Sequence, residues 1–142
     1  MRLSQGPATM DSKNKGIIFD IKRFAIHDGA GIRTTVFIKG CPLRCPWCHN
    51  PEGRKREIEL VWFSSLCVRC GSCVGACSQN ALTLADGKIM IDKNAFTLNA
   101  DCIKACPTGA IKFDGREITA EEVYTEIIKD KVFYFEKGGI TL

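Results

Sequence analysis

Apolar and polar positions along the first part of the chain predict two short strands. Residues 17–24 (IIFDIKRF) and 33–39 (RTTVFIK) are rich in β-branched and aromatic residues, and a glycine-rich segment, 27–31 (HDGAG), separates them. The second run carries Val36, Phe37 and Ile38 in succession. A run of this kind is typical of a strand that is buried on both faces, as in a parallel sheet.

A helical pattern returns near the end of the chain. Residues 119–131 begin with Thr119 and Glu122, which have the spacing of a capping box, and continue with apolar residues on one helical face. Residues 138–142 (GGITL) predict a last strand. Strands separated by helical and loop segments indicate an α/β fold.

The middle of the chain does not follow either pattern. It contains short apolar runs, glycine-bearing turns and most of the cysteines, which predicts a small insert that is held together by metal rather than by a large core. We therefore divide the chain into a disordered leader, an N-terminal segment, an insert and a returning helix and strand, at residues 1–15, 16–57, 58–115 and 116–142.

Composition sets limits on the function. The chain has 142 residues, 45% of them hydrophobic, and a net charge of +4, which is too mild a basic excess to indicate a nucleic-acid-binding protein. No apolar run reaches transmembrane length, and the first residues do not resemble a secretory signal. We therefore expect a cytoplasmic protein without a membrane partner.

The chain contains nine cysteines. The number is odd, most of them lie two or three residues apart, and a reducing compartment is expected. Such spacing suits ligands of one metal centre better than disulfides, which need a specific separation of the backbone. We therefore expect metal ligation.

Cys41, Cys45 and Cys48 form the first group, directly after the second predicted strand. Thiolate ligands favour zinc or an iron–sulfur cluster. Structural zinc needs a fourth ligand, and the nearest candidate, His49, is adjacent to Cys48 and badly placed to reach the same ion. A [4Fe–4S] cluster held by three thiolates would instead leave one iron open for a substrate.

The surroundings of these cysteines carry a family resemblance. Residues 29–33 (GAGIR), Phe37 and residues 40–51 (GCPLRCPWCHNP) resemble the activating enzymes of glycyl radical enzymes, the pyruvate formate-lyase activating enzyme-like group of the radical S-adenosylmethionine (SAM) superfamily. Ala30 departs from that pattern, which usually has proline there; the loss of turn rigidity should matter little.

The resemblance implies the start of a partial (β/α) barrel, interrupted by a small α+β ferredoxin-like insert. It implies an oxidoreductase in which SAM binds the open iron. One electron from the reduced cluster then cleaves SAM to methionine and a 5′-deoxyadenosyl radical. That radical removes a hydrogen from a glycine of a partner, the glycyl radical enzyme. The electron donor would be a ferredoxin or flavodoxin, and no protein side chain is assigned a catalytic role.

The resemblance also assigns roles to individual residues. Trp47 lies beside the cluster near SAM, or only packs over the cluster, and Gly40 allows a close turn into the loop. Asp28, Gly29 and Arg33 face the partner's glycine loop; the alternative is a structural turn with an ion pair at the strand end.

The insert has the cysteine spacing of bacterial ferredoxins. In that fold the fourth cysteine of one run binds the cluster of the other run. The second run is present only as its tail, Cys102 and Cys106. The rule of exchanged ligands then predicts one complete [4Fe–4S] site, made of Cys67, Cys70, Cys73 and Cys106.

Cys77 and Cys102 remain as a degenerate second site, since the two other ligand positions are Phe96 and Asn99. The pair could serve as apolar filling, as a weak metal site or as a disulfide in air, and we favour filling because buried cysteine behaves as a small hydrophobe. The insert as a whole could be a structural staple or an electron path to the first cluster.

Other functions remain as alternatives. The Gly-Gly-Glu motif that helps to bind SAM in the family would begin near residue 142, so the chain could be part of a longer reading frame, an inactive truncated product or half of a split enzyme. A non-catalytic iron–sulfur electron carrier and a zinc-binding interaction module are the competing functions.

Overall fold

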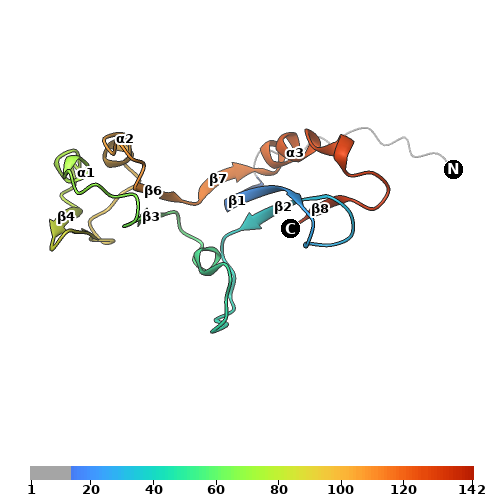
Figure 1. The fold of residues 1–142 in the computed structure, drawn as a ribbon, viewed down its shortest axis with the longest axis horizontal. Helices are drawn as coiled ribbons and strands as arrows, with labels where there is room; N and C mark the ends of the chain where they lie inside the picture. The colour runs from blue at the N-terminus through green and yellow to red at the C-terminus, as the bar shows by residue number, and fades with distance from the viewer. Residues whose placement is uncertain (1–13) are drawn as a thin grey trace. The chain divides into compact units, whose positions relative to one another are not determined.

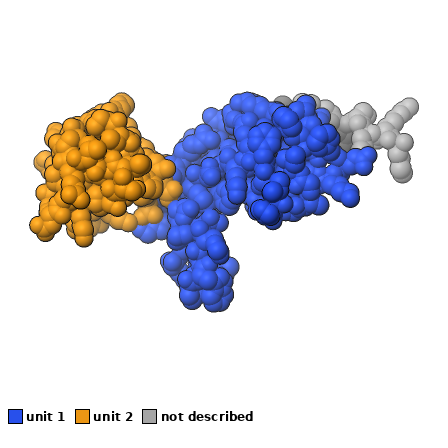
Figure 2. All heavy atoms as spheres, in the orientation of Figure 1, with its two compact units in different colours: residues 1–57, 115–142 blue, residues 58–114 orange. Residues whose placement is uncertain are grey.

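A computed structural model describes residues 14–142, so the leader predicted for residues 1–15 lies almost entirely outside the described part (Figure 1). The chain divides into two compact units (Figure 2). The first combines the residues up to 57 with residues 115–142, and the second comprises residues 58–114. The polypeptide thus leaves the first unit, builds the second, and returns.

The first unit contains a four-stranded mixed sheet in the order β7-β1-β2-β8. β1 pairs antiparallel with both β2 and β7, whereas β8 pairs parallel with β2. The strands predicted near residues 17–24, 33–39 and 138–142 are confirmed. The bounds of the four strands are Lys15–Ala25 (β1), Arg33–Ile38 (β2), Arg116–Thr119 (β7) and Gly139–Thr141 (β8).

The expectation for β2 holds in part. Thr34, Thr35 and Val36 are buried in succession, so both faces of the strand are covered there, whereas Ile38 is 52% exposed. β2 pairs parallel with β8 and antiparallel with β1, so the sheet is mixed rather than parallel. The consecutive apolar residues continue to the strand end, where the cysteine loop begins.

The predicted C-terminal helix is α3, Ala120–Ile128, and it is followed by a 3₁₀ turn, η2, at Lys131–Phe133. The backbone N–H of Glu122 donates to the Thr119 hydroxyl at 3.1 Å, and the N–H of Thr119 donates to the Glu122 carboxylate at 2.8 Å. The capping box is therefore confirmed. Ile127 of α3 packs against the sheet in a core of Ile18, Val36 and Ile118.

The second unit is built from two small β-ribbons and two one-turn helices. β3 (Glu59–Trp62) pairs antiparallel with β6 (Ile111–Asp114), and β4 (Leu82–Ala85) pairs antiparallel with β5 (Lys88–Ile91). The helices are α1, Ser72–Gly75, and α2, Asp101–Lys104. The core of this unit includes three cysteines among its apolar side chains: Leu60, Cys73, Cys77, Ala81, Leu82, Ile89, Cys102 and Ile111.

The fold is therefore mixed α/β. No helix in residues 14–142 is long and apolar enough to cross a membrane.

Candidate metal centres

The three-cysteine loop begins directly after β2 and keeps its thiols near the surface. Cys41 is exposed, and Cys45 and Cys48 are half-buried. The N–H of Cys48 donates to the carbonyl of Cys45 at 3.2 Å, which bends the segment between them into a tight turn. This arrangement leaves the thiols accessible to a group that arrives from solvent.

The base of the loop is closed by hydrogen bonds. The carbonyl of Gly53 accepts from the N–H groups of Gly40, at 2.7 Å, and of Cys41, at 3.0 Å. The ammonium of Lys39, a residue that is only 6% exposed, donates to the carbonyl of Glu52 at 2.8 Å. Since a buried ammonium is costly without acceptors, this contact ties the end of β2 to the 3₁₀ turn η1, Pro51–Arg54.

Two glycines are required at this base. Gly40 has φ +111°, a conformation that side chains rarely adopt, and a Cβ there would lie 2.7 Å from Cγ of Arg56. Gly53 is buried, and a Cβ there would lie 2.9 Å from the ring of Phe19. The close turn predicted at Gly40 is thus present, while its contact with a cofactor stays a prediction.

Two large apolar side chains of the loop point to solvent. Trp47 is 76% exposed and Leu43 is 62% exposed. Exposed apolar side chains beside three thiols provide a surface that could cover a bound group and exclude water from it. The role predicted for Trp47 beside a cluster therefore stays a prediction.

Arg33, predicted to face a partner, is bound within its own unit. Its guanidinium donates to the hydroxyl of Thr141 at 2.7 Å, to the carbonyl of Ala30 at 3.5 Å and to the carbonyl of Ile140. These bonds tie the turn after β1 to β8.

Asp28 is held in the same turn. Its carboxylate accepts from the hydroxyl of Thr35 at 2.6 Å, and its carbonyl accepts from the hydroxyl of Thr141 at 3.0 Å. Gly29 between them is exposed. These contacts fix the conformation of the turn, and the partner-facing role of Asp28, Gly29 and Arg33 stays a prediction.

In the insert, the cysteines predicted to form the complete site differ in exposure. Cys73 lies in α1 and is buried, Cys67 and Cys106 are half-buried, and Cys70 is exposed. The hydroxyl of Ser72 donates to the sulfur of Cys70 at 3.3 Å, and the Cys106 sulfur lies 3.7 Å from the Thr108 hydroxyl.

Hydrogen bonds favour the thiolate form in two of these residues. The pKa of Cys70 is lowered by the hydroxyl and backbone N–H of Ser72. Burial alone would raise the pKa of Cys106, but hydrogen bonds from the N–H and hydroxyl of Thr108, and from further backbone N–H groups, outweigh it and lower this pKa. The thiolate is the form that binds metal, so the donor set fits a cluster.

Neighbouring thiolates affect the pKa values in this group. Burial raises the pKa of Cys73, and the negative charges of Cys106 and Cys67 raise it further. The charge of Cys106 also opposes the lowering of the Cys70 pKa. That the four side chains hold one cluster stays a prediction from their spacing.

Cys77 and Cys102 lie in the same buried core as Cys73. They are 7% and 2% exposed. Burial raises the pKa of Cys102, and the charge of Cys77 raises it further. All nine cysteines lie in the described residues and all are free thiols, so the structure contains no disulfide between Cys77 and Cys102.

Across residues 14–142, no group of three or more His, Cys, Asp or Glu side chains gathers closely enough to hold one metal ion. The grouping of the thiols around a metal centre therefore stays a prediction from their spacing.

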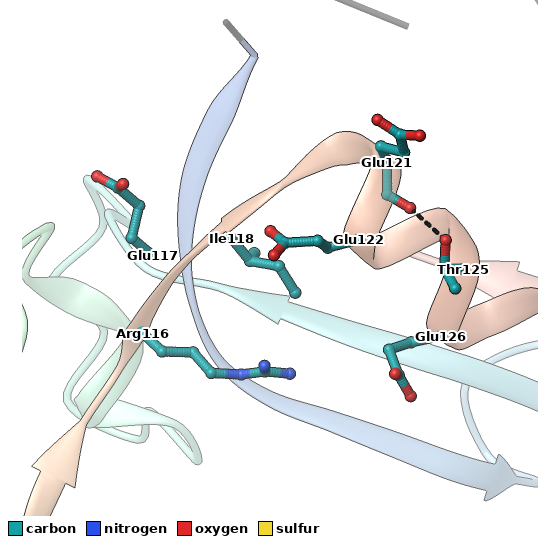
Figure 3. Close-up of a pocket in the computed structure, with 7 residues that line it drawn as sticks. All are labelled: Arg116, Glu117, Ile118, Glu121, Glu122, Thr125 and Glu126. Atoms are coloured by element: carbon teal, nitrogen blue, oxygen red, sulfur yellow. Dashed lines mark hydrogen bonds between the residues drawn. The ribbon is translucent and has the colours of Figure 1, made fainter. Parts of the chain in front are cut away.

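A groove between β7 and α3 collects several carboxylates (Figure 3). Glu122 is engaged in the capping box, Glu117 pairs with Lys15 at 2.7 Å, and Glu126 pairs with Lys129 at 2.7 Å. These groups are a hydrated, ion-paired face, and we assign the groove no function.

Sequence reasoning missed Lys39, Gly53 and Asp130. Lys39 and Gly53 close the cysteine loop, and Asp130 is 3% exposed and accepts from the hydroxyl of Thr34 at 2.9 Å. A lysine at a strand end and an aspartate after a helix look like ordinary surface residues. No signal in one sequence reveals their burial, because it depends on contacts with segments far along the chain.

A protein-family model described as a 4Fe–4S dicluster domain matches residues 66–110, which lie within the second unit. The isethionate sulfite-lyase activating enzyme of Oleidesulfovibrio alaskensis is 44% identical in an alignment of 138 residues. The alignment covers 93% of this chain and 45% of that protein.

Two further relatives are named as activating enzymes of other enzymes. The indoleacetate decarboxylase activating enzyme of Tractidigestivibacter scatoligenes is 37% identical, over 93% of this chain and 45% of that protein. The choline trimethylamine-lyase activating enzyme of Oleidesulfovibrio alaskensis is 38% identical, over 89% of this chain and 42% of that protein. The chain thus spans slightly less than half the length of these relatives. Over most of its own length, the chain is a homologue of the activating enzymes of glycyl radical enzymes.

Proposed function

We propose that this chain contributes the cluster-binding N-terminal part of a radical SAM activating enzyme, and that its substrate is a glycine in a glycyl radical enzyme. The observation that carries the proposal is the three-cysteine loop with its closed base, in a chain homologous to activating enzymes. Cys41, Cys45 and Cys48 would each bind one iron of a [4Fe–4S] cluster.

When bound, a reduced cluster held by the three cysteines and SAM would supply the radical chemistry. The chain's residues have other tasks. The three cysteines hold the cluster, and Lys39 and Gly53 fix the base of their loop. The exposed Trp47 would cover the cluster and SAM and exclude water from them.

The insert would carry a second cluster on Cys67, Cys70, Cys73 and Cys106. The lowered pKa values of Cys70 and Cys106 support this assignment. The insert would serve either as an electron path from a ferredoxin or flavodoxin or as a structural staple, in a protein of the reducing cytoplasm.

The first unit would be the start of a partial (β/α) barrel that the insert interrupts. Two features support this view. β8 lies at the edge of the four-stranded sheet, where a further strand could pair with it. A groove lined almost entirely by apolar side chains lies along β1, β2, β7, α3 and β8, and further barrel elements could cover it.

The turn between β1 and β2 would face the partner's glycine loop. Arg33 and Asp28 hold this turn against β8 through Thr141. The exposed backbone at Gly29 is then presented in a fixed conformation, which suits the docking of an extended peptide.

The test is reductive SAM cleavage by the anaerobically reconstituted chain, completed to the length of its relatives, because the chain spans less than half of them. The proposal predicts 5′-deoxyadenosine and methionine in equal amounts, and loss of both products in Cys41→Ala, Cys45→Ala and Cys48→Ala variants. A matched control is Cys77→Ala, which leaves the loop intact. A chain that carries both clusters, takes up electrons reversibly and forms neither product would support the electron-carrier alternative instead.

A further inference from the structure

The matching family model describes a domain with two clusters, but one of the two cluster positions in this insert is occupied by protein. We infer that the insert binds a single [4Fe–4S] cluster and that the second position is a closed, metal-free core. The inference rests on the cluster proposed at Cys67, Cys70, Cys73 and Cys106, and it is independent of SAM cleavage.

Phe96 occupies one ligand position of the second cluster, and its ring belongs to the core. It packs against the hydrophobic core of the second unit, and its ring centroid lies 6.0 Å from that of Phe113. The turn in front of it is fixed, since the N–H of Phe96 donates to the carbonyl of Asp92 at 3.1 Å. The ring therefore fills space that a dicluster domain would give to the cluster.

Asn99 occupies the other ligand position, and protein contacts use both ends of its amide. Its NH₂ donates to the Ser78 hydroxyl at 3.1 Å, and its carbonyl oxygen accepts from the N–H of Asp101 at 3.0 Å. A carboxamide is also a poor ligand for iron in a cluster, which takes soft thiolates. Asn99 thus serves to connect the segment after Cys77 with the start of α2.

A second bridge closes the same position. The N–H of Thr97 donates to the side-chain carbonyl of Gln79 at 2.8 Å, and the Gln79 amide donates back to the Thr97 hydroxyl. The pocket lined by Gln79, Phe96, Asn99, Cys77 and Cys102 has no space for a water molecule. A cube of four irons and four sulfides could not enter without breaking both bridges.

The remaining thiols behave as core side chains. Cys77 and Cys102 are almost fully buried, and the Cys102 thiol donates to the carbonyl of Asn99, with 3.9 Å between sulfur and oxygen. The two thiols lie among apolar side chains, and Phe96 and Asn99 stand where further thiolates would be needed, so both cysteines act as small hydrophobic core residues.

Iron stoichiometry tests this inference. The full chain with Cys41→Ala, Cys45→Ala and Cys48→Ala together, reconstituted anaerobically, has only the insert as a cluster site. We expect about four irons and about four sulfides per chain, as for one cubane cluster. About eight of each would overturn the inference, and so would none, since the insert would then hold no cluster. Neither result would decide SAM cleavage, which the unmodified chain reports.

Two further variants in the same background identify the ligands. Cys77→Ser with Cys102→Ser should leave the iron content unchanged, whereas Cys106→Ser should reduce it severely. A loss of half or more of the iron in the Cys77/Cys102 variant would overturn the inference. Because either variant could fold badly, the electron paramagnetic resonance (EPR) spectrum of the reduced triple-alanine chain provides a second measurement. One cluster predicts a single signal without spin–spin broadening, and interacting signals from two clusters would contradict it.

Discussion

The ammonium of Lys39 donates a hydrogen bond to the carbonyl of Glu52, 2.8 Å away, across the base of the three-cysteine loop. Lys39 directly follows β2, and Glu52 lies in η1. The bond therefore fixes the two ends of the loop relative to each other. Gly53 accepts two backbone hydrogen bonds beside it. Residues that are not ligands thus fix the base of the loop that would hold the cluster.

Lys39→Met should weaken cluster retention at the three cysteines. Methionine retains the packing of the stem but leaves the Glu52 carbonyl without its charged donor, at a cost of about 1–3 kcal/mol. We expect faster loss of iron from this site to a chelator, with an unchanged insert cluster. Lys22→Met, at an exposed position of β1, is the matched control. Equal iron loss in both variants would contradict a positioning role for Lys39.

Gly53→Ala should disturb the same base by crowding. Its new Cβ would lie 2.9 Å from the Phe19 ring, so the ring or the loop must shift. Overpacking of this kind should lower the free energy of unfolding by about 1–3 kcal/mol, and chemical denaturation measures this change. At Gly16, in contrast, a Cβ meets nothing within 4 Å. Gly16→Ala should therefore be nearly neutral, and a neutral Gly53→Ala would disprove the close packing.

Asp130→Ala should destabilise the first unit. The Asp130 carboxylate accepts from the buried Thr34 hydroxyl at 2.9 Å and from the guanidinium of Arg23 at 3.0 Å. Removing it leaves the Thr34 hydroxyl buried without its acceptor, at a cost of about 1–3 kcal/mol in the free energy of unfolding. Asp130→Asn keeps one acceptor oxygen and should lose less. A larger loss in the asparagine variant would argue against this account.

The capping box of α3 predicts a pH dependence. Hydrogen bonds from the backbone N–H and hydroxyl of Thr119 lower the pKa of Glu122 below its ordinary value. The carboxylate therefore stabilises the folded state above its unfolded pKa, and this contribution disappears as the pH falls through the lowered folded pKa. Glu122→Gln should be less stable than the wild type near neutral pH and equally stable in strong acid. A difference that does not change with pH would refute the prediction.

Local sequence signals predicted much of the first unit because they act through neighbouring residues. The capping box of Thr119 and Glu122 was readable because both partners lie within one turn of helix. The end of β2 could not be predicted in this way, since the exposure of Ile38 and the burial of Lys39 depend on segments that are distant in the sequence.

The cysteine spacing predicts that Cys67, Cys70, Cys73 and Cys106 hold one cluster, and this grouping stays a prediction. Spacing could not reveal how the second cluster position is filled. That depends on the side chains of Phe96 and Asn99 and on the bridge between Gln79 and Thr97, which only the folded structure shows.

The central claim is that Cys41, Cys45 and Cys48 hold a cluster with one iron open to SAM. EPR of the dithionite-reduced chain, with and without SAM, tests it most directly. The account predicts that SAM changes the signal of the wild type and leaves unchanged the signal of Cys45→Ala, in which only the insert cluster remains. A fully loaded wild-type chain whose spectrum ignores SAM, or an equal SAM effect in Cys45→Ala, would contradict it.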